Sequence, residues 1–325
     1  MVIPTVRRRD LLLQAVESVV GQTLPPAEVI VVVDRPSSVP SDGTEDALAV
    51  RFPSVRVIHS GGRGDGPARQ QGIAQASGTW VTFLDDDDLW HRDRLASTEQ
   101  HIVGHPGCAA VQAPLWLFSV DPNAPEEAYG LRRDVVAVDL TELHRHAASH
   151  PPANDFSYLD IHGRSLELML ERNRGAIPTA TIRRDVLDRC SPAPDHLRTG
   201  TDWLLFTDVA AQTEWCMIEE GLAFVRLHQG QGSRDPAVAR DQARVMAMQW
   251  ERHADHAPRP AAFYADEYVP MLRQALWTTL RVRRWSDARV VASASSRLLP
   301  RWRDRAAVMV PGRIAHRVGG WRGGS

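Results

Sequence analysis

The stretch WVTFLDDDD, residues 80–88, decides the fold, because it joins an apolar strand to four consecutive carboxylates. The apolar run from 80 to 84 is typical of a buried strand. Four adjacent anions repel one another, and burying even one of them without a partner is costly. Carboxylate oxygens are the ligands that Mg²⁺ and Mn²⁺ prefer, so the cluster predicts a divalent cation at the end of this strand. The alternative is a solvated acidic turn or the first turn of a helix.

Upstream of this stretch, apolar strand patterns alternate with helical patterns. Strands are expected at residues 2–3, 29–33 and 55–58, and helices at residues 11–20 and 67–76. Uninterrupted apolar strands separated by helices predict an α/β fold whose mostly parallel sheet has helices on both faces. In such sheets, ligands bind outside the carboxyl ends of the strands. Thr5, Asp34 and Asp85 all follow strands, so we expect them at one rim of the sheet.

The second half of the chain alternates less regularly and ends in helices. Strands are predicted at residues 109–120, 176–182 and 223–227, and helices at residues 165–171 and 201–211. From Pro236 onward only helices are expected, with breaks near residues 258–260 and at Pro300.

The composition is that of an ordinary globular protein. The chain has 325 residues, of which 43% are hydrophobic and 24% are charged, with a formal net charge of −2. This length suits one large domain with appendages or two smaller domains. The near-neutral charge does not favour nucleic acid as a partner. All 38 basic residues are arginines, which excludes a catalytic lysine.

The cysteines and the start of the chain indicate a cytoplasmic protein. Cys108, Cys190 and Cys216 are widely spaced and odd in number, so we expect no disulfide framework, no paired metal-ligand motif and a reducing compartment. Pro4 and the arginines at 7–9 interrupt the apolar start, so no signal peptide is expected. No apolar stretch approaches the ~20 residues that span a bilayer.

Four motifs occur in order along the first part of the chain. They read IPTVRR with SVVGQT downstream (3–8 and 18–23), VVDRPS (32–37), GDGPARQQG (64–72) and LDDDDLW (84–90). In this order and spacing they resemble the family-2 glycosyltransferases, which have the GT-A fold, a Rossmann-like sheet with flanking helices. The resemblance extends from residue 2 to about residue 230. It predicts a catalytic domain at residues 1–232 and a C-terminal helical region at residues 233–325.

The resemblance implies an inverting, hexosyltransferase-type enzyme that moves a sugar from a nucleotide diphosphate sugar to an acceptor hydroxyl, with Mn²⁺ or Mg²⁺ at residues 85–88. A UDP-sugar is the expected donor, because uridine is the commonest base in the family. Several positions that line the nucleotide pocket depart from the family motifs and leave the base open. They are Val6 and Arg7 in place of Tyr and Asn, Val33 in place of Asp, and Arg35-Pro36 in place of Gly-Ser. The acceptor is open as well: a saccharide, a lipid-linked glycan or a natural product.

Site roles are carried over to the matching positions. The resemblance implies that Asp87 holds the metal and that His228 completes the metal shell or touches the diphosphate, with a plain loop histidine as the alternative. Asp34 is expected to hydrogen-bond the base, unless it only ends its strand. Arg69 suits a phosphate or the acidic cluster, with a local salt bridge as the alternative. The expected donor-binding residues are Pro4, Thr5, Arg8, Asp34, Arg69, Asp85 and Asp86.

An inverting transfer also needs a base that takes the proton of the acceptor hydroxyl. The family supplies it from an acidic pair at the start of a late helix, where this chain has Thr201-Asp202. Asp202 is therefore the candidate base, and an ordinary helix N-cap is the alternative. Should Asp202 not be the base, Asp208 and the carboxylates near residues 155–160 are the next candidates.

Two further segments carry charged or metal-binding side chains. His144, His146 and His150 do not have the spacing of a zinc signature, so we expect a solvated loop or an acceptor-side surface. From Arg297 to the end, seven arginines stand against one acid and are interleaved with apolar residues. A helix packed on the catalytic domain with an Arg-rich outer face is expected; the alternative is peripheral contact with an anionic membrane. A homodimer is left open.

Two other functions compete with sugar transfer. A sugar-nucleotide nucleotidyltransferase would also use a parallel sheet and Mg²⁺, but it needs a glycine-rich activating loop after the first strand, where only arginines occur. A non-catalytic nucleotide-sugar-binding member of the fold is the second alternative. The presence of both Asp87 and Asp202 argues against it.

Overall fold

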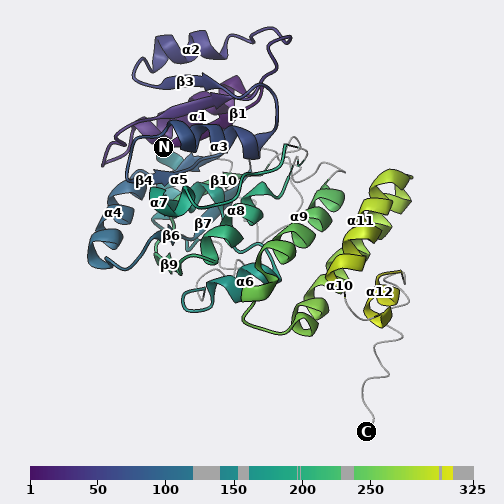
Figure 1. The fold of residues 1–325 in the computed structure, drawn as a ribbon. Coiled ribbons are helices and arrows are strands. Elements are labelled where there is room, and N and C mark those ends of the chain that lie inside the picture. Colours follow the sequence, from purple (N-terminus) through teal and green to yellow (C-terminus); the bar gives the residue numbers. More distant parts are fainter. Residues whose placement is uncertain are drawn as a thin grey trace.

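The computed structural model describes residues 1–119, 140–152, 161–195, 197, 199–227, 238–299 and 302–309 (Figure 1). Its elements are β1 (Val2–Thr5), α1 (Arg9–Val20), β2 (Ile30–Val33), α2 (Thr44–Arg51), β3 (Arg56–His59), α3 (Asp65–Gln75), β4 (Trp80–Thr82), β5 (Leu89–Trp90), α4 (Arg94–Gly104), β6 (Ala110–Gln112), β7 (Leu115–Phe118), α5 (Leu140–Ala147), α6 (Ser165–Glu171), η1 (Ile177–Thr179), β8 (Thr181–Arg183), α7 (Arg184–Leu187), α8 (Thr201–Ala210), β9 (Trp215–Met217), β10 (Ala223–Arg226), α9 (Val238–His253), η3 (Ala254–His256), α10 (Ala261–Arg281), α11 (Trp285–Leu298) and α12 (Trp302–Met309).

The strands form a mostly parallel arrangement with a reversal of strand order at its middle. β1, β2 and β3 pair in parallel, in the order β1-β2-β3. On the other side of β1, a bridge from Val2 to Phe83 joins it to the segment of β4, which begins the order β4-β8-β6-β9. The chain thus moves outward from β1 to β3 and then returns past β1 to β4. Ligands of open α/β sheets bind at such a switch point, and the predicted fold class is confirmed.

Helices cover both faces of the β1–β3 sheet, because successive side chains of a strand point to opposite faces. Ile3 and Val31 belong to the same buried cluster as Leu12 and Val16 of α1. Val2 instead packs in the cluster that contains Ala68 of α3. This second contact is very close: a Cβ on Gly72 of α3 would lie 2.3 Å from a methyl carbon of Val2.

A helical layer follows the last strand. Figure 1 shows α9 beside α8, with α10 and α11 beyond α9, away from α2 and β3. Leu298, Leu299 and Val308 are buried there against the other C-terminal helices and against Trp203 and Leu204 of α8. Leu298, Leu299 and Val308 of the basic segment therefore pack inward, whereas Met309 is exposed. None of the helices within the described ranges is both long enough and apolar enough to cross a membrane.

Some elements differ from those that the sequence predicts. Helices α2 and α4 were not expected, and the single strand predicted at residues 109–120 is two strands, β6 and β7, in different sheets. The predicted strand at 176–182 begins with the turn η1. Pro114 and Pro178 lie at these irregular points, where a missing N–H prevents a continuous ladder.

The prediction that the cysteines form no disulfide is wrong, because Cys108 and Cys216 are joined. The two residues are 108 positions apart in the chain. They meet because β6 and β9 are adjacent parallel strands, with Val111 opposite Cys216. Cys190 is a free, half-buried thiol.

Arg94 is a fully buried arginine that connects α4 to the floor of the sheet. Its guanidinium donates to the carbonyl oxygens of Pro178 and Ala180 and to the hydroxyl of Thr181, at 3.1 Å each. It also lies over the ring of Trp90, 4.4 Å from the ring centroid. Burial away from water lowers the pKa of Arg94 to about 9. These contacts fix the irregular backbone around η1.

Candidate active site

One pocket of about 660 Å³ lies at the carboxyl ends of β1, β2 and β4 and is closed on the other side by α8 and α9. Side chains from distant parts of the chain face each other across it. Its lining consists of Pro4, Thr5, Val6, Arg8, Asp34, Asp65, Arg69, Asp85, Asp86, Asp87, Asp88, Asn173, Ile177, Thr199, Gly200, Asp202, Trp203, Val225, Val238 and Gln242.

At the centre of the pocket, two neighbouring carboxylates converge on one cationic nitrogen. Nη1 of Arg8 lies 3.0 Å from Oδ1 of Asp86 and 2.5 Å from Oδ2 of Asp87. The hydroxyl of Thr5 donates to the second oxygen of Asp86 at 2.7 Å. The first strand and the acidic cluster are thereby tied together across the switch point.

Arg69 links the acidic cluster to the start of α3. Its side chain is 4% exposed and lies 3.2 Å from Asp85 and 3.7 Å from Asp65. Gly66 allows this arrangement, because a Cβ at that position would lie 2.6 Å from a methyl carbon of Thr201. The first turns of α3 and α8 can therefore approach closely. Burial raises the pKa of Asp65, and the nearby charge of Asp202 raises it further.

The fourth carboxylate of the cluster has a structural role. Asp88 is 5% exposed and accepts a hydrogen bond from the backbone N–H of Arg226 at 2.9 Å. The Arg226 guanidinium donates to the carbonyl oxygen of Asp87, also at 2.9 Å. β10 is thus fixed against the acidic cluster. Asp88 also lines the pocket, but this hydrogen bond uses one of its oxygens.

Burial raises the pKa values of the pocket carboxyls. For Asp86, loss of water is the largest effect and the charge of Asp87 adds to it, so that its pKa rises to about 6 although Arg8 opposes the shift. Burial is also the largest effect on Asp85, and the charges of Asp87, Asp65 and Asp86 add to it, so that its pKa rises to about 7 although Arg69 opposes the shift. The Asp85 side chain is nevertheless 38% exposed, and pocket water offsets part of this effect. Asp86, 6% exposed, is therefore the better guide to the pH response of the site.

These residues fit a divalent cation. Carboxylate oxygens of Asp86 and Asp87 already surround one positively charged atom, and a third carboxyl, Asp85, opens into the same pocket. Hard cations such as Mg²⁺ and Mn²⁺ take this kind of oxygen ligand. A cation at Asp87 would have to displace Arg8 from that carboxylate. Metal binding would therefore depend on where the Arg8 side chain lies.

Asp34 holds the loop between β3 and α3. Its Oδ1 accepts hydrogen bonds from the Ser60 hydroxyl and from the backbone N–H groups of Gly62 and Arg63, and its Oδ2 accepts one from Gly64, at 2.6 to 2.9 Å. Gly62 and Gly64 have φ values of 79° and 108°, a region that favours glycine. Contact of Asp34 with a base stays a prediction; the carboxylate certainly shapes the loop beside the pocket.

Asp202 lies across the pocket from the acidic cluster, in the first turn of α8. The residue before this helix, Gly200 with φ 81°, occupies the N-cap position, so the N-cap alternative for Asp202 is excluded. The amide of Asn173 donates to Oδ2 of Asp202 at 2.8 Å. Asp202 is half-buried, and its other oxygen accepts no hydrogen bond from a side chain or backbone group of the described residues.

The other candidates for the catalytic base, and the histidines singled out in the sequence, lie elsewhere. Asp208 is bound by Arg252 at 2.9 Å and His253 at 2.7 Å and does not line the pocket. His228 and the carboxylates near residues 155–160 lie outside the described residues. His144 accepts a hydrogen bond from the backbone of Arg92, in a second, separate pocket.

Three residues in or beside the pocket could not be assigned from the sequence. Asp65 lies inside the quoted glycine motif, and this position was the one available signal. Asn173 and Arg226 carry no motif, because their roles depend on the partners Asp202 and Asp88, which lie far away in the chain.

Comparison with known proteins agrees with this geometry. A family model described as "Glycosyl transferase family 2" matches residues 1–133, the part of the chain that contains the acidic cluster and Arg69. These residues are therefore similar to glycosyltransferase family 2. The chain is 26% identical over 248 residues to the succinoglycan biosynthesis protein ExoO of Rhizobium meliloti (strain 1021), covering 72% of this chain and 64% of that relative. It spans 15% to 64% of the length of the first three curated relatives that it matches.

Solved glycosyltransferases have the same fold. S. aureus TarS in complex with UDP-GlcNAc matches with a TM-score of 0.60 and 16% identity, over 95% of this chain and 83% of that one. The mannosyltransferase PcManGT from Pyrobaculum calidifontis, in complex with GDP-Man and Mn²⁺, matches with a TM-score of 0.54 and 16% identity, over 99% and 80%. At this identity the likeness concerns the fold.

Proposed function

We propose that this protein is an inverting glycosyltransferase that moves a hexose from a UDP-sugar to an acceptor hydroxyl, with Mn²⁺ or Mg²⁺ at the acidic cluster. The convergence of Asp86 and Asp87 on one cationic atom, in a pocket that also holds Asp202, carries the proposal. The family match over residues 1–133 supports sugar transfer, and the UDP-GlcNAc in the TarS complex supports the nucleotide sugar.

The donor would bind along the wall formed by the first strands. Asp87 would hold the metal, which supplies positive charge to the leaving diphosphate. Arg8, released from the two carboxylates, is positioned to contact the same diphosphate. Asp85 and Asp86 would face ribose or sugar hydroxyls, and Arg69 keeps Asp85 oriented. Pro4, Thr5 and Asp34 complete this wall.

The acceptor would bind on the opposite wall. Inversion requires the acceptor oxygen to attack from the side opposite the leaving group, so the base must face the donor wall. Asp202 does so, and Asn173 orients it by a hydrogen bond to one oxygen while the other is free to take the proton. A saccharide acceptor is supported by the relative named for succinoglycan biosynthesis.

We also propose that residues 1–232 form the catalytic domain and that residues 233–325 stabilise its acceptor side. Val238 and Gln242 of α9 line the pocket, so the helical region contributes to the site as well as to packing.

The decisive experiment is a thermal-shift and calorimetric screen of UDP, GDP, ADP and CDP with and without Mn²⁺. Selective binding stabilises the fold by about 2.7 kcal/mol at a hundredfold excess over Kd. Asp87→Asn should remove the Mn²⁺-dependent part of nucleotide binding. Asp185→Asn, on an exposed carboxylate outside the pocket, should leave it unchanged. Equal metal-dependent affinity in both variants would contradict the assignment of Asp87.

A further inference from the structure

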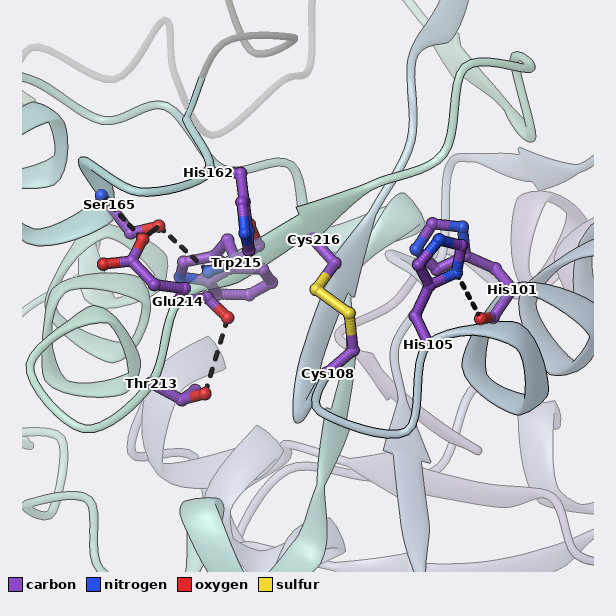
Figure 2. Close-up of a disulfide and its surroundings, with 9 residues drawn as sticks. All are labelled: His101, His105, Cys108, His162, Ser165, Thr213, Glu214, Trp215 and Cys216. Carbon is purple, nitrogen blue, oxygen red and sulfur yellow. Dashed lines mark hydrogen bonds between the residues drawn. A yellow bond between two sulfur atoms is a disulfide. The ribbon is translucent and has the colours of Figure 1, made fainter.

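A second group of metal-binding side chains lies far from the sugar-transfer pocket, at the outer strand pair of the sheet. Figure 2 shows the disulfide between Cys108, which precedes β6, and Cys216 in β9, with the imidazole rings of His101 and His105 beside it. A ring nitrogen of His101 and the two sulfur atoms all lie within 4.8 Å of one another. None of these residues lines the pocket of the acidic cluster.

The His101 side chain has an unused coordination position. Its Nε2 is fully buried and has no hydrogen-bond partner, although buried polar atoms are normally satisfied. The ring is held in place by its neighbour: His105 stacks on it at 4.2 Å, and Nδ1–H of His105 donates to the carbonyl oxygen of His101 at 2.9 Å. An oriented imidazole with a buried, unpartnered nitrogen next to two sulfurs is the arrangement that a metal site needs.

The two sulfurs can serve either as a disulfide or as two ligands. Tetrahedral zinc with Zn–S bonds of about 2.3 Å places its two sulfurs about 3.8 Å apart. The Cα atoms of Cys108 and Cys216 are 6.1 Å apart, so rotation of the side chains provides this separation without a backbone shift. Disulfides do not persist in a reducing compartment, where the pair would present two thiols to His101.

We propose that the reduced Cys108–Cys216 pair and His101 form a structural site for a thiophilic divalent cation, Zn²⁺ in the first place, and that oxidation to the disulfide closes it. Water completes the four ligands. Residues 103–107, which connect His101 to Cys108, are exposed.

The chemistry balances in two steps. A dithiol reductant transfers two electrons and two protons to the disulfide, giving two cysteine thiols and the oxidised reductant. Zn²⁺ then binds both sulfurs as thiolates, together with neutral His101, and releases two protons to solvent. A disulfide oxidant reverses the sequence: it takes two electrons from the two thiolates and two protons from solvent, becomes a dithiol, and leaves the ion without its sulfur ligands.

Cobalt distinguishes this site from the acidic cluster, because only thiolate ligands give a thiolate-to-cobalt charge-transfer band. The full chain is reduced with a phosphine, freed of reductant without oxygen, and titrated with Co²⁺ and then Zn²⁺. We expect the band at one equivalent in reduced protein, its loss on adding Zn²⁺, and no band in oxidised protein. Reduced protein should also retain one more zinc per chain after desalting than oxidised protein does.

Matched variants locate the ligands. Cys216→Ser should abolish the band, and His101→Gln should weaken Co²⁺ binding at least about tenfold. Cys190→Ser, at the free cysteine outside the cluster, and Asp87→Asn, in the other pocket, should leave the band intact. The wild-type comparison of the two redox states needs no variant to fold. Absence of the band in reduced wild-type protein, or equal zinc content in both states, would overturn the proposal and leave a simple disulfide.

Discussion

The two walls of the pocket differ in charge. The wall from the first strands is charged: Arg8 and Arg69 are paired with Asp85, Asp86 and Asp87. The facing wall comes from residues 173–242 and has Asp202 as its charged group, among the neutral side chains of Asn173, Ile177, Thr199, Trp203, Val238 and Gln242.

This difference separates two tasks. The carboxylates and arginines of the first wall are paired with each other. They can exchange these partners at little cost, the carboxylates for a metal and the arginines for a diphosphate. The second wall offers a single carboxylate, Asp202, that can take one proton from an uncharged hydroxyl. Changes on the first wall should therefore alter binding, and changes on the second should alter turnover.

The largest effect is expected from Asp202→Asn. Loss of a general base lowers kcat by a factor of about 10² to 10⁴, while donor affinity stays nearly unchanged, because the base acts on the acceptor in the transition state. Initial rates with the true acceptor, together with calorimetry of the nucleotide, separate the two quantities. Near-normal turnover would move the base elsewhere; Asp208, held by Arg252 and His253 outside the pocket, is then excluded by its position.

Arg8→Gln should change metal and donor affinity in opposite directions. Without the guanidinium, Asp86 and Asp87 lose the cation that now occupies them, so Mn²⁺ should bind about tenfold or more tightly in the absence of nucleotide. Nucleotide diphosphate should bind more weakly, because one phosphate contact is lost. Calorimetry of Mn²⁺ alone and of UDP with Mn²⁺ measures both. Arg9→Gln, next along the chain and paired with exposed Asp10, is the control, and parallel changes in both affinities would argue against the exchange.

A smaller effect is expected from Asn173→Ala. Its amide donates one hydrogen bond to the Asp202 carboxylate, and bonds to charged groups are worth about 1.5–3 kcal/mol. kcat should fall about tenfold to a hundredfold, with the Kd of the donor unchanged. Asn173→Gln, which keeps the amide but moves it, tests whether position matters. A change in donor Kd without a change in kcat would show that Asn173 belongs to the other wall.

The smallest effect concerns pH. Burial raises the pKa of Asp86 to about 6, above the unfolded value of about 3.9, so the folded metal-free protein binds the proton more tightly. This group therefore favours folding below about pH 4, and its contribution is lost as the pH rises through 6. Because Mn²⁺ competes with the same proton, its affinity should fall several-fold between pH 7.5 and 5.5. Calorimetry at the two pH values checks this, and a pH-independent Kd would show that protonation of Asp86 does not affect the metal site beside it.

The charged wall was largely predictable from sequence, and the neutral wall was not. Strand ends, the carboxylate run and Arg69 occur in local sequence patterns, and the structure places them in one pocket. Asn173 and Gln242 face the pocket only because α8 and α9 pack as they do, which no local pattern reports. The disulfide was missed for the same reason: the pairing of β6 with β9 brings together cysteines that are far apart in sequence.

The fold shows a similar division. The alternation of Val2 and Ile3 predicts two covered faces, and both are covered. Helix α4 was missed because its interior position is held by Arg94, a charged residue whose hydrogen bonds to the η1 backbone cannot be foreseen from composition. From sequence alone, an arginine is expected on the surface, and a buried one is recognised only when its hydrogen-bond acceptors are known.

The bridge between Val2 and Phe83 has a consequence for motion. In the described part of the sheet, β1 and β4 meet at this one bridge, while β1 and β2 share four paired positions. Backbone pairing is thus weaker between β1 and β4 than between β1 and β2. The hydrogen bond from Thr5 to Asp86 joins the ends of the two segments through side chains. A cation on Asp87 together with a diphosphate on Arg8 would link the two strands across this boundary. Amide hydrogens of residues 83–84 should then exchange more slowly when the pocket is filled. Hydrogen exchange at these residues would therefore show whether a ligand is bound.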